Sequence, residues 1–204
     1  MQNRQIIEPK RSIDVIHETD VLVVGSGPGG LSAAIASARC GVKTTLLERF
    51  GCFGGNITVV GVEGFAWYRH EKTVEAGGIG REFEELAKEM GAAVPESQSL
   101  SYELDSEGFK LVADKLVMDS GIHPMLHRSF SMPIMEGNTI IGVIVESKAG
   151  REAILSKVVI DATGDADVAF RAGAQLNTMP VEELMATSVM FHLAGVDKKA
   201  FLSE

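Results

Sequence analysis

The sequence predicts an α/β fold with a central parallel sheet, and three observations support this prediction. Residues 21–24 form a short run of apolar and β-branched residues that stops at a glycine. Residues 28–40 follow with alanines at helical spacing, and residues 42–47 return to the composition of a strand. A strand, a helix and a second strand within about thirty residues are typical of a βαβ unit, whose two strands lie parallel.

After residue 49, the sequence predicts a helical insert and then an antiparallel meander. Helices are expected over residues 79–90 and 105–120, because apolar residues recur on one face of each segment. Turn signals then separate short apolar runs, as in strands joined by hairpins. The expected strands cover residues 122–127, 129–135, 139–146 and 152–160, followed by a short helix over residues 165–172 and a strand over residues 188–193.

Composition and charge exclude several classes of protein. Of the 204 residues, 45% are hydrophobic and 23% are charged, which is ordinary for a soluble globular protein. The net charge of −9 argues against a nucleic-acid partner and against an anionic membrane surface. No apolar run is long enough to cross a bilayer. The first 19 residues contain no apolar block of the signal-peptide type, so a cytoplasmic location is expected.

The loop Gly25-Ser-Gly-Pro-Gly-Gly30 has the form G-x-G-x-x-G and stands between the first strand and the helix. In this context the pattern predicts a dinucleotide site. Gly25 permits a tight turn, Gly27 lets a pyrophosphate approach the backbone, and Gly30 lets helix and strand pack closely. The helix N-terminus offers free N–H groups and partial positive charge to the phosphates. The fold class is therefore a Rossmann-like FAD/NAD(P)-binding domain.

Glu48 ends the second strand, where its carboxylate would accept hydrogen bonds from ribose hydroxyls. A carboxylate at this position disfavours a 2′-phosphate and therefore NADP. FAD is favoured over NAD, because a long insert and a meander precede the last parallel strand. In an NAD domain, the second strand would lead directly through another helix to the third strand, with no meander.

At three places the sequence resembles the FAD-dependent oxidoreductases with a glutathione-reductase-type FAD domain. These are residues 20–31, residues 47–49 and residues 158–166, which read Val-Val-Ile-Asp-Ala-Thr-Gly-Asp-Ala. Residues 54–58 and 61–65 are similar to the bacterial branch that includes an invasion-associated protein.

The resemblance implies a cofactor site with FAD as the ligand. It assigns the pyrophosphate to the glycine loop, the ribose to Glu48 with Arg49 beside it, and adenine to the backbone of Phe130. It also places a covering loop at residues 54–56 and a second motif at residues 162–164, with Asp165 near the cofactor. The full expected set is Gly25, Gly27, Pro28, Gly29, Gly30, Glu48, Arg49, Gly54, Gly55, Asn56, Phe130, Ala162, Thr163, Gly164 and Asp165.

No catalytic residue and no metal site is predicted. Cys52 lies where related disulfide reductases keep a redox pair, but it has no partner at that spacing, which favours a structural thiol. His123 and His127 are four residues apart, a metal spacing in a helix, but their surroundings predict a strand. Residues 67–70 form either a substrate-facing lid or a packed surface loop.

The expected organisation is a lead over residues 1–19, an FAD-binding domain over residues 20–175 with an insert over about 50–104, and the start of a truncated substrate domain over residues 176–204. Members of the resembled family are about twice as long, so weak or partial FAD binding and no efficient turnover are expected of this chain alone. The predicted function is the FAD-binding part of an oxidoreductase that acts on a small-molecule substrate, and self-association into a homo-oligomer is left open. The alternatives are an NAD-dependent dehydrogenase, a non-catalytic flavin-binding or host-interaction protein, and a thiazole-synthase-like protein, for which no metal or cysteine pattern is seen.

Overall fold

The computed structural model describes residues 5–65, 69–70, 74–75, 77–96 and 101–202. The chain forms two compact units, of residues 1–51 with 116–174 and of residues 52–115 with 175–204. The first unit holds the α/β fold that the sequence predicts. No helix among the described residues is both long and apolar enough to cross a membrane.

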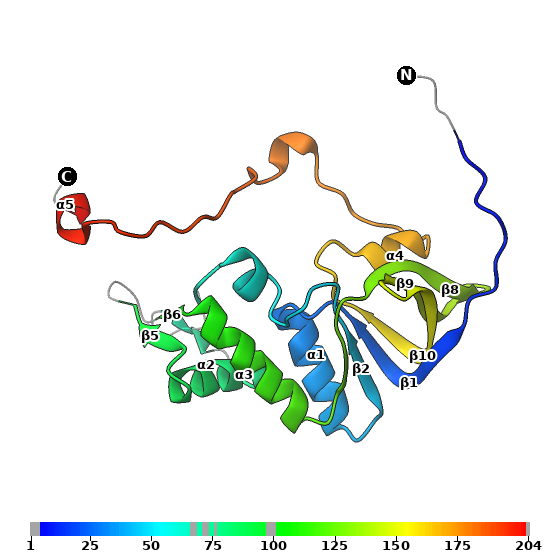
Figure 1. Cartoon of the computed structure of the whole chain (residues 1–204), viewed down its shortest axis with the longest axis horizontal. Coiled ribbons are helices and arrows are strands. Elements are labelled where there is room, and N and C mark those ends of the chain that lie inside the picture. The colour runs from blue at the N-terminus through cyan, green and yellow to red at the C-terminus, as the bar shows by residue number, and fades with distance from the viewer. Residues whose placement is uncertain (1–4, 66–68, 71–73, 76, 97–100, 203–204) are drawn as a thin grey trace. The chain divides into compact units, whose positions relative to one another are not determined.

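The first unit is built on a six-stranded sheet in the order β7-β2-β1-β10-β9-β8. Figure 1 shows α1 lying along one face of this sheet. The elements are β1 (Val15–Val24), α1 (Pro28–Arg39), β2 (Thr44–Leu47), β7 (His123–Met125), β8 (Ser129–Glu136), β9 (Thr139–Ser147), β10 (Gly150–Asp161) and α4 (Asp167–Arg171).

Strand β10 joins the parallel and antiparallel halves of this sheet. Its residues from Ala153 onward run parallel to β1, with Val158 opposite Val21, and its residues up to Leu155 run antiparallel to β9, with Ala153 opposite Ile144. Strands β8, β9 and β10 form the predicted meander. The expected strand over residues 122–127 is not part of it, because β7 instead extends the parallel sheet beside β2.

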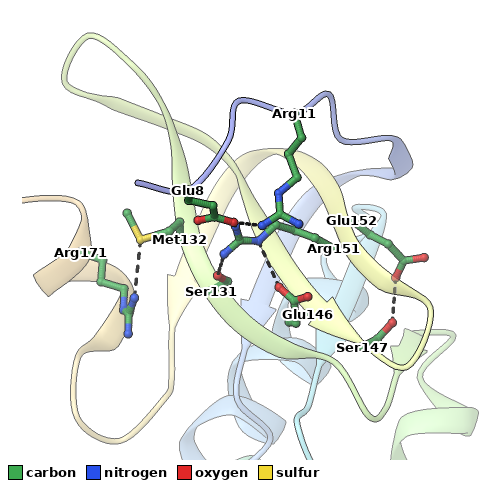
Figure 2. Close-up of polar contacts among 9 residues, drawn as sticks. All are labelled: Glu8, Arg11, Ser131, Met132, Glu146, Ser147, Arg151, Glu152 and Arg171. Atoms are coloured by element: carbon green, nitrogen blue, oxygen red, sulfur yellow. Dashed lines mark hydrogen bonds and ion pairs between the residues drawn. The ribbon is translucent and has the colours of Figure 1, made fainter. Parts of the chain in front are cut away.

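Strand β1 begins earlier than the apolar run of residues 21–24 suggests. Val15 pairs with Ala153 and Thr19 pairs with Ser156, so β10 extends the strand toward the N-terminus. The segment before β1 also contacts the meander, since Glu8 accepts a hydrogen bond from Arg151 Nη1 at 2.9 Å (Figure 2). The same guanidinium bonds Glu146 and Ser131 on the two other meander strands.

The core of the first unit lies where α1, the sheet and α4 bury their apolar faces. Leu31, Ala34 and Ile35 of α1 are fully buried. The small side chain of Ala34 lets α1 lie close to the strands that it covers. One cluster of buried residues in this unit is Leu22, Val24, Leu47, Met125, Val143, Val145, Ile154 and Val168.

The second unit contains the insert. Its elements are a π-helical turn (Asn56–Val60), β3 (Arg69–His70), β4 (Val74–Glu75), α2 (Ile79–Glu89), β5 (Ala93–Pro95), β6 (Tyr102–Leu104), α3 (Ser106–Asp119, whose last residues belong to the first unit), a 3-10 turn (Val181–Glu183) and α5 (Lys198–Leu202). The Phe109 ring packs against the rings of Phe65 and Phe83, with centroids 5.8 and 6.1 Å away.

One expectation for the second unit is wrong. The strand expected over residues 188–193 is absent: these residues are exposed and form no regular element, and none of the described segments pairs with them as a strand. Helix α2 also carries a buried carboxylate, since Glu84 is fully buried and binds Lys88 Nζ at 2.5 Å. A buried carboxylate requires such a partner, and helical spacing alone does not reveal it.

Replacement of Ile154 by alanine should destabilise the first unit by about 2–5 kcal/mol, because its fully buried side chain would leave a cavity. Val158 lies on the same strand with half of its surface exposed, so Val158→Ala should cost less than about 1 kcal/mol. Urea denaturation of both variants measures the difference, and equal losses would contradict the assigned core.

A pair of histidines stacks at the N-terminal part of β1. The rings of His17 and His123 lie 4.5 Å apart, and His17 Nε2 lies 2.9 Å from Thr45 Oγ1. Burial holds the pKa of His17 below its ordinary value, and the nearby His123 and Lys43 lower that pKa further. Folding therefore favours the neutral imidazole.

This shift predicts that acidification destabilises the protein. Below about pH 6.5, His17 binds a proton in the unfolded chain more readily than in the folded one, so stability is lost as the pH falls. Urea denaturation between pH 8 and pH 5 should show this loss, and His17→Gln should reduce it. His127→Gln is the control, because the exposed His127 lies outside the pair, and an unchanged slope in His17→Gln would refute the assignment.

Candidate functional site

The glycine loop between β1 and α1 is shaped first by close backbone packing. Gly25 has φ +99°, and its N–H donates to Leu47 O at 2.9 Å. A Cβ on Gly25 would stand 2.3 Å from Ala162 O, and a Cβ on Gly30 would stand 1.9 Å from Gly25 O. These two glycines are therefore required by contacts within the chain.

The other two glycines of the loop face open space. Among the described residues, a Cβ on Gly27 or Gly29 would meet no atom within 4 Å. Gly27 is the N-cap of α1 and no side chain caps that helix, so its first N–H groups are left for another acceptor. Uncapped donors beside open glycines form a cradle that fits a phosphate group.

Glu48 lies at the carboxyl end of β2, and only 5% of its surface is exposed. Its Oε2 accepts hydrogen bonds from Ser26 N at 2.9 Å and from Ser26 Oγ at 2.6 Å, and its Oε1 accepts one from Phe50 N at 2.9 Å. Its backbone N–H donates to Met125 O, and its carbonyl accepts from Arg128 N. The carboxylate is thus fixed against the glycine loop.

The residues after Glu48 form an exposed shelf. The Arg49 guanidinium lies 4.7 Å from the centroid of the Phe50 ring. His127 donates its backbone N–H to Phe50 O at 3.1 Å, and its φ of +55° is unusual for a residue with a side chain. Its ring occupies the space beside Gly51, where a Cβ would stand 2.6 Å from His127 Cε1.

The second motif follows β10 and touches the first. Ala162 donates its N–H to Val24 O at 2.9 Å and packs against both Gly25 and Gly30. Asp161 Oδ1 accepts hydrogen bonds from the N–H and the hydroxyl of Thr163, and Asp161 Oδ2 accepts one from Ala169 N. Asp161 therefore stabilises the turn that connects β10 to α4.

The structure brings together only part of the expected cofactor set. In the first unit, Gly25 and Gly30 contact Ala162 directly. Phe130 pairs with Val145 of β9 and packs against the core, whereas Asp165 is exposed. Their assigned roles stay predictions, as does that of residues 54–56, which lie in the second unit.

Within the second unit, the loop at residues 54–56 has a strained backbone. Gly54 has φ +114° and Gly55 has φ +56°, and Asn56 starts the π-helical turn. A Cβ on Gly54 would also collide with Thr58 Cγ2 at 2.5 Å. Packing inside the unit accounts for Gly54 without a ligand.

The candidate cysteines and histidines form neither a disulfide nor a metal site among the described residues. Cys40 is exposed and Cys52 is half-buried, and both are free thiols, with Cys52 Sγ 3.9 Å from Thr58 Oγ1. His123 stacks on His17, and the described residues contain no group of three or more side chains placed to hold a metal. Of the segment at residues 67–70, Trp67 and Tyr68 lie outside the described residues.

Sequence reasoning missed Ser26 and Asp161 as organisers of the site. Both stand inside the recognised motifs, Ser26 at a position that the glycine pattern leaves open and Asp161 at the end of β10. A serine beside a strand-ending glutamate is a weak signal. Only the folded backbone shows that the two side chains meet.

Comparison with known proteins places this site in a family. Residues 20–204 match the sequence profile of the family described as FAD dependent oxidoreductase. The chain belongs to the FAD-dependent oxidoreductase family. The cofactor of this family is FAD, as expected, and the loop, Glu48 and the second motif all lie within the matched residues.

Curated relatives of this FAD-dependent oxidoreductase chain include thiamine thiazole synthases. That of Metallosphaera sedula is 33% identical over 160 residues, covering 73% of this chain and 55% of the relative. That of Saccharolobus solfataricus is 33% identical over 162 residues, covering 74% and 57%. The chain thus spans about half the length of the curated relatives that it matches.

Solved structures confirm the fold class. THI4 of Thermovibrio ammonificans aligns with a TM-score of 0.55 at 22% identity, covering 76% of this chain and 61% of that one. L-proline dehydrogenase of P. horikoshii aligns with a TM-score of 0.57 at 13% identity, covering 79% and 57%. At these identities the likeness concerns the fold alone.

The two kinds of glycine in the loop should respond differently to alanine. Gly30→Ala places a methyl group 1.9 Å from a carbonyl oxygen and should destabilise the fold by more than about 2 kcal/mol. Gly27→Ala meets no atom of the described residues and should change the free energy of unfolding by no more than about 0.5 kcal/mol, the range of a surface substitution. Similar losses in both variants would contradict this division.

Proposed function

We propose that this chain forms the FAD-binding part of a flavin-dependent oxidoreductase that acts on a small-molecule substrate. The observation that carries the proposal is the uncapped, open glycine cradle beside the buried Glu48. Gly27 and Gly29 would hold the pyrophosphate and Glu48 the adenosine ribose. When bound, FAD supplies the electron chemistry by accepting and passing on a hydride or an electron pair.

Two features of the first unit support FAD as the ligand. The fixed negative charge of Glu48 opposes a 2′-phosphate, which argues against NADP. The antiparallel meander before the last parallel strand supports the narrower assignment to the glutathione-reductase type of FAD domain. The similarity of residues 54–58 and 61–65 to the invasion-associated bacterial branch is a weaker ground, and that branch stays a prediction.

Thiazole synthesis is a second candidate function. The 33% identity to thiamine thiazole synthases over 160 residues favours it, although the cysteines and histidines of the sequence do not. Mass spectrometry of the compound released from the denatured protein separates the two candidates. Released FAD favours the oxidoreductase, and a released thiazole compound favours the second candidate.

Binding measurements on the whole chain test the proposed ligand. FAD should bind, and FMN should bind far more weakly, because FMN lacks the adenosine monophosphate half of FAD, and with it the adenosine ribose and one phosphate of the pyrophosphate. Glu48→Gln should weaken FAD binding about tenfold, since hydrogen bonds to a charged group contribute about 1.5–3 kcal/mol. Fluorescence titration measures all three affinities, with urea denaturation as the control for folding.

Two results would overturn this proposal. Equal affinity for FMN and FAD would show that the adenosine half is not recognised. Tight binding of NAD without binding of FAD would favour the dehydrogenase alternative. A flavin that binds but stays oxidised with every donor would instead favour the non-catalytic alternative.

The setting of the protein is also proposed. We propose from the sequence a division into residues 1–19, 20–175 and 176–204, a cytoplasmic location and self-association. Cell fractionation and analytical ultracentrifugation address the last two.

A further inference from the structure

Ser26 makes two of the hydrogen bonds that orient the Glu48 carboxylate. The Ser26 side chain is fully buried inside the glycine loop, where a small apolar residue would fill the same space. It instead gives Glu48 two donors, its backbone N–H and its hydroxyl, and both reach the same carboxylate oxygen. The hydroxyl bond of 2.6 Å has the short length of a bond to a charged acceptor.

These contacts leave the two carboxylate oxygens unequal. A carboxylate offers about four lone-pair positions, about two on each oxygen. Among the described residues, Oε2 accepts both bonds from Ser26, whereas Oε1 accepts one bond, from Phe50 N. Oε1 is therefore the oxygen with room for a further donor.

We propose that Ser26 is a positioning residue, whose hydroxyl holds Glu48 so that Oε1 is presented to a ribose hydroxyl of the cofactor. This inference rests on the proposed function, because it concerns the same FAD site. Two donors on one oxygen and one on the other fix the carboxylate before the ligand arrives. A fixed acceptor loses little conformational freedom on binding, so its hydrogen bond contributes more to affinity.

The experiment compares FAD with an analogue whose adenosine lacks both ribose hydroxyls, using the whole chain. In the unchanged protein the analogue should bind about tenfold more weakly than FAD. In Ser26→Ala this ratio should fall to less than about threefold, because the carboxylate loses its shortest hydrogen bond and is held only by two backbone N–H groups. Ser156→Ala is the matched control. It removes a buried hydroxyl of β10 that has no hydrogen-bond partner among the described residues, and it should keep the original ratio.

The ratio separates positioning from a structural role. A variant that is only partly folded binds both ligands more weakly by the same factor, which leaves the ratio unchanged. If Ser26→Ala does not fold, Ser26→Cys gives the same test, since a thiol is a weaker donor and should produce an intermediate ratio.

The outcomes distinguish this inference from the proposed function. An unchanged protein that binds neither ligand overturns the FAD assignment and with it the role of Ser26. Normal FAD binding with the same ratio in Ser26→Ala overturns the role of Ser26 alone. A reduced ratio in Ser26→Ala, together with the original ratio in Ser156→Ala, supports the positioning role.

Discussion

The contact between the Gly25–Gly30 turn and Ala162 is the constraint on which the rest of the site depends. The carbonyl oxygens of Ala162 and Gly25 occupy the positions that Cβ atoms on Gly25 and Gly30 would take. This approach joins the ends of β1 and β10 to the start of α1, and it fixes the direction in which α1 points. The inner side of the turn is filled by backbone, whereas its outer side, at Gly27 and Gly29, is open among the described residues.

The buried charge of Glu48 is the second organising element, and it depends on the first. A carboxylate that is 95% buried would be costly without donors, and the turn supplies two of them through Ser26. The third comes from Phe50, just after β2. Loop and strand end therefore stabilise each other, and the negative charge stays at the edge of the sheet where the open glycines lie.

Short-range patterns predicted the parts of the fold that short-range physics determines. The helix expected over residues 28–40 is observed over Pro28–Arg39, and the meander strands agree within a few residues, because turn glycines and apolar periodicity act locally. The extension of β1 to Val15 depends on pairing with β10, and the burial of Glu84 depends on Lys88. The contact of Ser26 with Glu48 spans 22 residues, which no local pattern shows.

The division of the loop glycines also explains why the sequence predicts a cofactor more readily than a substrate. A phosphate cradle of this kind uses backbone N–H groups and needs positions without side chains. These needs are visible in the sequence as a pattern of glycines. Substrate recognition depends on side chains brought together from distant segments, as the meeting of Ser26 and Glu48 illustrates on a small scale. A backbone cradle of this kind can therefore serve many reactions without change, while the side chains around the reacting end of the flavin determine which reaction each protein performs.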